Sequence, residues 1–80
     1  MLQEQLDLLK LPKDVRGPVS DLVRALEATS TRADIESEGA MQLAFILSLE
    51  KAKRLKPANI EALYIIFDDA VQARLRDIES

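Results

Sequence analysis

Residues 39–49 read GAMQLAFILSL and are apolar around nearly the whole circumference of a helix. An ordinary surface helix has one apolar stripe and one polar side, so a helix of this kind must be covered from several directions. In a chain of only 80 residues, the cover has to come from the remaining helices or from a second copy. The stretch therefore predicts an all-α protein with this segment at its centre.

The flanking residues extend this segment into a predicted helix over about residues 31–55. Thr31 is suited to cap its first amides, Asp34 suits its first turn, and Pro57 follows its end. We expect this helix to have two apolar sides. One side holds Ala33, Ala40, Leu43, Ala44 and Leu47, and the other holds Met41, Phe45, Leu49 and Ala52.

A second long helix is predicted over about residues 58–78, because its apolar residues recur on one side at 100° per residue. These residues are Ile60, Leu63, Tyr64, Phe67, Ala70, Val71, Leu75 and Ile78. The connection between the two helices is short, so we expect them to form an antiparallel hairpin.

Two shorter helices are predicted before this hairpin. The first ends near Leu11, because Pro12 disfavours helical geometry in the residue before it. Residues 12–16 are expected to form a turn, after which Gly17 and Pro18 start the second helix. The predicted fold is a small three- or four-helix bundle with the central hairpin 31–55 and 58–78, in one domain over residues 1–80.

Composition favours self-association. A domain of this size buries only about 60% of the surface of its unfolded chain, and the sequence has no Cys and no His to supply disulfides or strong metal ligands. The helix predicted over residues 58–78 can cover one apolar side of the helix over residues 31–55. The other side needs either the first two helices or the hairpin of a second subunit. Because oligomerisation is the remaining source of extra stability, we expect a homodimer. The net charge of −3 makes nucleic acid an unlikely partner. Without a basic leader or a long apolar run, we expect no membrane association and a cytoplasmic location.

Two residues of the helix predicted over residues 58–78 are candidates for contact with a partner. Arg74 falls near the centre of its apolar stripe. Its methylenes could lie on the core with the guanidinium in water, or it could form an ion pair with Glu36 or Glu38 that fixes the register, or it could bind a partner anion. Ile65 lies on the opposite, polar side, either as an ordinary exposed residue or as part of a second contact surface.

We predict that the partner surface combines the outer side of this helix with the acidic start of the preceding one. Its candidate residues are Ile65, Asp69, Arg76, Glu36, Glu38 and Arg74. An alternative phosphate-binding patch consists of Lys51, Lys53, Arg54 and Lys56, although basic residues at the end of a helix also stabilise its dipole.

Carboxylates cluster at Asp34, Glu36 and Glu38 and again at Asp68 and Asp69, which raises the possibility of a divalent-metal site. Carboxylate bundles that hold metals commonly use Glu-x-x-His pairs, and this chain has no His, so we interpret the acids as a solvated surface. Nucleophilic catalysis lacks its usual His and Cys. We therefore predict no catalytic residue, no metal and no cofactor.

The sequence predicts a non-enzymatic regulator or inhibitor that binds another protein, as small bacterial or phage proteins tend to do, and that acts as a homodimer. This prediction depends on surplus apolar surface rather than on a motif. A ligand-binding or nucleic-acid-binding module at residues 51–56 is the second hypothesis, and a metal-dependent hydrolase using the helical carboxylates is the third.

Overall fold

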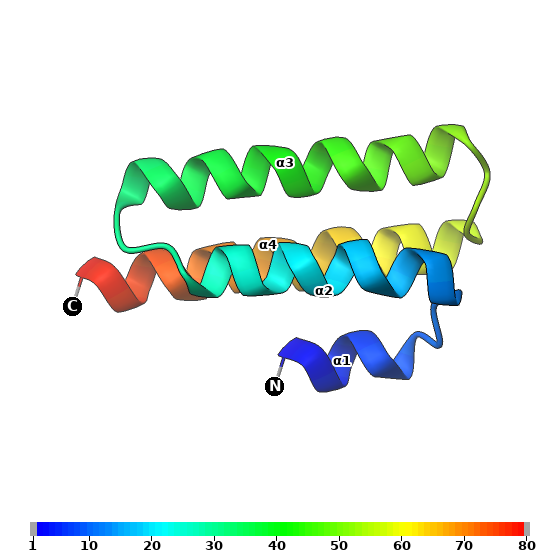
Figure 1. Ribbon diagram of the computed structural model, residues 1–80, viewed down its shortest axis with the longest axis horizontal. Helices are drawn as coiled ribbons and strands as arrows, with labels where there is room; N and C mark the ends of the chain where they lie inside the picture. Colours follow the sequence, from blue (N-terminus) through cyan, green and yellow to red (C-terminus); the bar gives the residue numbers. More distant parts are fainter. Residues whose placement is uncertain (1, 80) are drawn as a thin grey trace.

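The computed structural model describes residues 2–79 and contains four helices and no strand in that range (Figure 1). The helices are α1 (Leu2–Leu8), α2 (Lys13–Glu27), α3 (Arg32–Lys51) and α4 (Pro57–Glu79). Helices α3 and α4 run antiparallel and share the largest contact in the molecule. The predicted all-α bundle with a central hairpin is confirmed.

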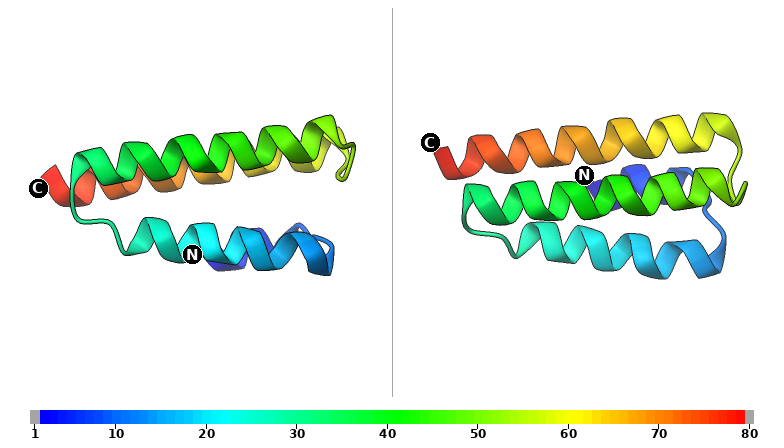
Figure 2. Two further views of the ribbon diagram at one scale, coloured as in Figure 1. Left: turned by 45° about the horizontal axis from the view of Figure 1, so that its top comes forward. Right: turned by 90° about the horizontal axis from the view of Figure 1, so that it is seen from above.

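Helix α3 lies on one side of the molecule and α1 on the other. Helix α3 packs against α4 and α2, whereas α1 contacts α2 and α4 and makes no contact with α3. Figure 2 shows α3 in front when the molecule is seen from above, with α4 and α2 at its flanks and no helix over its outer side. One side of the longest apolar segment is therefore left open.

The core lies between the four helices. On α2, α3 and α4 it is built from residues three or four positions apart, and α1 and the connection after it add Leu6 and Leu11. Fully burying an aliphatic or aromatic side chain contributes roughly 1.5–3 kcal/mol, so this set accounts for most of the packing energy. Its members are Leu6, Leu11, Val15, Val19, Val23, Ile46, Leu49, Ile60, Leu63 and Phe67.

The side of α3 that faces the core differs from both predicted sides. Its buried residues are Ile35, Gln42, Ile46 and Leu49, which follow the alternating three- and four-residue spacing of a helix packing seam. Of the residues on the predicted sides, Leu49 is buried and Phe45 is half-buried, and the others are exposed. Because Gln42 is polar, it breaks the apolar pattern of the seam, so apolar periodicity in the sequence does not identify this side of α3 as the buried one.

The predicted start of α2 at Gly17 and Pro18 is wrong, because the helix begins at Lys13 and contains Pro18. Proline normally clashes with the Cβ of the preceding residue in a helix, and Gly17 has none. Val15 and Val19 are both buried, one on each side of this position. Burial of the continuous apolar stripe therefore outweighs the backbone bond that Pro18 cannot make.

Helix α3 ends at Lys51 rather than near residue 55, because the backbone reverses at Lys53 with a positive φ of 54°. The amide of Arg54 donates to the carbonyl of Leu49 at 3.0 Å, and the amide of Lys53 donates to that of Glu50 at 3.1 Å. This pair of bonds is the Schellman motif, which satisfies carbonyls at a helix end.

The end of α1 at Leu8, before the predicted Leu11, has a related cause. Lys10 has a φ of 52°, and its amide donates to the carbonyl of Asp7 at 3.1 Å. The left-handed residue ends the helix before Pro12 is reached.

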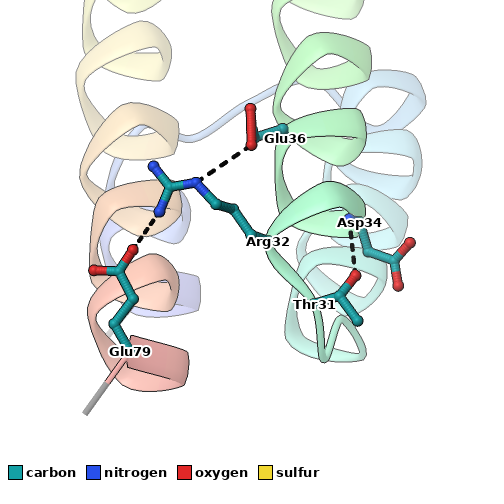
Figure 3. Close-up of polar contacts among 5 residues, drawn as sticks. All are labelled: Thr31, Arg32, Asp34, Glu36 and Glu79. Carbon is teal, nitrogen blue, oxygen red and sulfur yellow. Dashed lines mark hydrogen bonds and ion pairs between the residues drawn. The ribbon is translucent and has the colours of Figure 1, made fainter.

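At the other end of the molecule the predicted cap of α3 is confirmed, since Thr31 Oγ1 accepts a hydrogen bond from the amide of Asp34 at 3.1 Å (Figure 3).

None of the helices in residues 2–79 combines the length and the apolarity that crossing a bilayer requires.

Candidate protein-interaction surface

The open side of α3 carries a contiguous apolar surface, termed here the outer α3 face. It consists of Ala40, Met41, Leu43, Ala44 and Leu47. Met41 and Leu43 are each 55% exposed and Leu47 is 43% exposed. An exposed apolar surface of this kind is a candidate for contact with another molecule.

The outer α3 face exists because α3 is apolar on two opposite sides, one facing the core and one facing outward. The seam through Ile35, Gln42 and Leu49 faces the core, and the residues half a turn away on the helix face outward. The protein has only α2 and α4 to pack against α3, and both lie on its inner side. The outward apolar residues are consequently left without cover within one copy of the chain.

The outer α3 face has small residues along its middle and larger ones beside them. On a wheel at 100° per residue, Ala40 and Ala44 fall near the midline of the face. Met41 and Leu43 fall on its two flanks, and Leu47 lies close to the midline one turn beyond Ala44. Since the distance between packed helices depends on the side chains at the contact, two alanines allow another helix to approach closely.

Opposite charges bound the outer α3 face at its two ends. Asp34 and Glu36 lie at the start of the helix and are exposed, as is Lys51 at its end. Lys53 and Arg54 follow immediately. Residues 32–38 hold three acidic residues and one basic residue, and residues 50–56 hold four basic residues and one acidic residue, so the net charge changes from acidic to basic along this segment.

Glu36 is held near the end of α4 through Arg32. The guanidinium of Arg32 reaches Glu36 Oε1 from its Nε at 3.5 Å and pairs with Glu79 through Nη1 (Figure 3). All three side chains are more than half exposed, so each pair contributes little to stability. The arrangement leaves Glu36 accessible beside the outer α3 face.

Glu38 lies on a different side of α3 from Glu36. It is half-buried, its Oε2 atom is buried without a hydrogen-bond partner, and it borders a shallow pocket with Ala25 and Thr29 near the end of α2. Glu36 instead lines the groove between α3 and α4. The structure therefore does not bring these two predicted partner residues onto one surface.

Of the three alternatives for Arg74, the ion pair with Glu36 or Glu38 is not the contact found, because its partner is Thr29. Its guanidinium donates to the backbone carbonyl of Thr29 and, from Nε, to Thr29 Oγ1 at 3.4 Å. This side of α4 faces the end of α2 rather than α3, and Arg74 lines a pocket with Leu26. Because Thr29 lies in the connection between α2 and α3, these hydrogen bonds link α4 to the segment that follows α2.

Ile65, Asp69 and Arg76 lie together on the outward side of α4, and all three are exposed. On the helical wheel they are roughly 120° or more from Val71, the residue closest to Gly39 of α3. They therefore form a surface of their own, apart from the outer α3 face.

The predicted basic patch is larger in the structure than in the sequence. Arg54 pairs with Asp14 of α2, which brings the α3–α4 connection beside the start of α2. Residues 10–16 and 50–56 lie at the same end of the molecule (Figure 1). Together they hold seven of the eleven basic residues and two of the fourteen acidic ones. The basic members are Lys10, Lys13, Arg16, Lys51, Lys53, Arg54 and Lys56, all exposed.

Gln42 is a residue that apolar periodicity does not identify. It is 1% exposed, and its Nε2 atom has no hydrogen-bond partner. It lines the α3–α4 groove together with Gly39, Phe67 and Val71. The seven-residue spacing from Ile35 through Gln42 to Leu49 is the signal that could have located it.

The carboxylates do not assemble into a metal centre in the part of the chain that the structure describes, where no three Asp or Glu side chains converge on a possible ion position. Asp68 and Glu36 both line the α3–α4 groove, whose remaining walls are mostly apolar.

Comparison of the chain with protein-family models, with curated proteins and with solved structures finds no match.

Proposed function

We propose that this chain is a small non-enzymatic regulator or inhibitor that binds protein, works as a homodimer, and uses the outer α3 face as its contact surface. The observation that carries the proposal is the exposure of Met41, Leu43 and Leu47 around two alanines on one side of one helix. Covering this surface would remove apolar area from water, which is the main favourable term in protein association.

The composition supports binding rather than catalysis. The sequence contains no His and no Cys, the side chains most used as general bases and strong nucleophiles. The apolar α3–α4 groove brings two carboxylates to its rim, Glu36 and Asp68, without a basic partner among its lining residues.

The proposal is tested by measuring mass with light scattering for the wild type and two matched variants. Leu43→Glu places a charge on the outer α3 face, and Leu8→Glu makes the same change on α1, where Leu8 is 80% exposed and far from α3. The wild type and Leu8→Glu are expected at twice the 9.0 kDa chain mass, and Leu43→Glu at the chain mass. A wild type that stays at 9.0 kDa at every concentration contradicts the homodimer.

The outward side of α4 supplies the surface for the regulated protein in this proposal. Ile65, Asp69 and Arg76 stay exposed when the outer α3 face is covered, because they lie on another helix and point elsewhere. A host protein that binds the wild type should bind Ile65→Lys more weakly, while the mass of Ile65→Lys remains that of the wild type. Equal binding to both would remove this surface from the proposal.

The end of the molecule formed by residues 10–16 and 50–56, termed here the basic end, favours a second candidate function, the binding of a polyanion such as nucleic acid. Lys and Arg outnumber Asp and Glu there seven to two, although the whole chain is acidic. Fluorescence polarisation with labelled single-stranded and duplex DNA should show binding at low salt that weakens steeply as salt rises. Lys51→Glu with Lys53→Glu should abolish it. No binding at low salt contradicts this candidate.

A further inference from the structure

We infer that two copies of this chain pair across a two-fold axis with their α3 helices antiparallel, and that the axis passes between Leu43 and Ala44. The inference rests on the proposed function, because it takes the outer α3 face to be the homodimer interface. It adds the orientation of the two copies and the residues that meet. A two-fold interface uses the same surface on both copies, so that surface has to be complementary to itself.

The shape of the outer α3 face meets this condition in one register. When the axis lies between residues 43 and 44, Ala40 of one copy lies opposite Leu47 of the other, and Leu43 lies opposite Ala44. Leu43 and Leu47 therefore each face an alanine, as close packing of two helices requires, while Met41 lies on the flank of the face. A parallel pair would place Leu47 against Leu47 and Leu43 against Leu43, which would hold the helices apart over the alanines.

The charges along α3 select the same register independently. With the axis between residues 43 and 44, Glu36 lies opposite Lys51 of the other copy, and Asp34 lies level with Lys53. All four side chains are exposed in the single copy. A parallel pair would bring like charges together at both ends, and like-charge contacts disfavour an arrangement.

The distribution of charge over the whole molecule agrees with this orientation. The basic end contains the start of α2 and the α3–α4 connection, and the acidic start of α3 lies at the opposite end (Figure 1). Antiparallel pairing places the basic end of each copy beside the acidic start of α3 in the other. The attraction operates twice in every dimer because of the two-fold symmetry.

Single cysteines test the orientation cleanly, since the natural chain has none. Ala44→Cys lies beside the proposed axis, and Ala33→Cys lies on the same exposed side of α3 near its start. A disulfide requires Cα atoms within about 7 Å. Two copies of residue 33 would be roughly 30 Å apart in the antiparallel pair, at 1.5 Å of rise per residue.

Under mild oxidation Ala44→Cys should form a covalent dimer, and Ala33→Cys should remain a single chain on a denaturing gel. Cross-linking of both variants to the same extent indicates a parallel pair and overturns the orientation. A non-covalent dimer in which neither variant cross-links overturns the register. In both cases light scattering still detects a dimer, so the proposed function survives. A monomeric wild type overturns the homodimer and this inference together.

A charge exchange provides a second, independent measurement. Glu36→Lys and Lys51→Glu should each weaken the dimer, by roughly two- to tenfold in Kd as expected for exposed ion pairs. The double variant should recover most of the affinity, because the opposite charges meet again with their positions exchanged. Losses that add in the double variant would contradict the contact between Glu36 and Lys51.

Discussion

At the scale of the residue, Gln42 brings a side-chain amide whose Nε2 donor has no hydrogen-bond partner into an otherwise apolar seam. A buried donor without a partner costs about 1–3 kcal/mol relative to an apolar group of similar shape. Polar residues in packing seams can also fix the register of the helices, at the expense of stability. Gln42 lies between α3 and α4, where such a register effect would act on the central hairpin.

Replacement of Gln42 by Leu is expected to raise the free energy of unfolding by about 1–3 kcal/mol, because the unpaired amide is removed and the volume is nearly kept. Urea unfolding followed by circular dichroism measures the change. Gln42→Ala is the matched control and should be less stable than the wild type, since it leaves a cavity. A Leu variant that is less stable than the wild type would show that the amide has a partner.

Asp14 gives the molecule a small dependence on acid. The hydrogen bond from Arg54 holds the pKa of the Asp14 carboxyl below its ordinary value of 3.8. A lowered pKa in the folded state stabilises the fold above the ordinary value, and this contribution disappears as the pH falls below 3.8 through the folded-state pKa. Both partners are largely exposed, so the contribution is small.

Asp14→Asn should therefore lower the melting temperature slightly at neutral pH, and its difference from the wild type should shrink below pH 3.8. Thermal unfolding followed by circular dichroism over a pH series gives the comparison. In an Arg54→Met background the same substitution should lose this pH dependence. A difference that persists unchanged in acid would mean that the Arg54 contact is not its source.

At the scale of the element, local signals predict the starts of α3 and α4, whereas they do not predict the start of α2, the ends of α1 and α3, or the rotation of α3 about its axis. Thr31 locates the start of α3 because a hydroxyl cap acts within one turn, and the predicted start of α4 at about residue 58 is one residue from the observed start at Pro57. Local signals failed at Pro18, where burial of the flanking valines decides the outcome. They also failed for the inner side of α3, because an all-round apolar helix fits its neighbours in more than one rotation.

Gly39 separates the effect of helix propensity from that of packing. A Cβ added there would lie 3.6 Å from Val71 Cγ2, an ordinary contact, so Gly39→Ala should stabilise the protein by about 0.5–1 kcal/mol. Gly17→Ala is the control, and it should give no comparable gain because Pro18 follows it. Thermal or urea unfolding of both variants tests the prediction. Equal gains at the two positions would contradict the role given to Pro18.

At the scale of the whole molecule, the interaction surfaces depend on contacts that a sequence does not display. The sequence displays the basic patch at residues 51–56. Its extension by Lys10, Lys13 and Arg16 appears only in the folded chain, where two segments about forty residues apart lie together. The residues of the outer α3 face were identified as apolar, although their position on the open side was not. Both surfaces are consequences of how α3 lies on α2 and α4.

Self-association through the outer α3 face makes thermal stability depend on concentration. Anything that binds the folded chain and not the unfolded one stabilises it by mass action, and a second copy is such a ligand. The melting temperature of the wild type should therefore rise with protein concentration. That of Leu43→Glu should be constant. Concentration-independent melting of both proteins would argue against an interface on this face.

Helix α1 is the least secured element of the molecule. It has seven residues, of which Leu6 is buried, and it is too short to be stable by itself. Its amides should be the first to exchange with deuterium, well ahead of those of α3, in a mass-spectrometric time course. Each such opening would briefly uncover the apolar underside of α2 and α4, so the rate of fraying at the amino-terminal helix sets how often a protease or a chaperone can reach the interior.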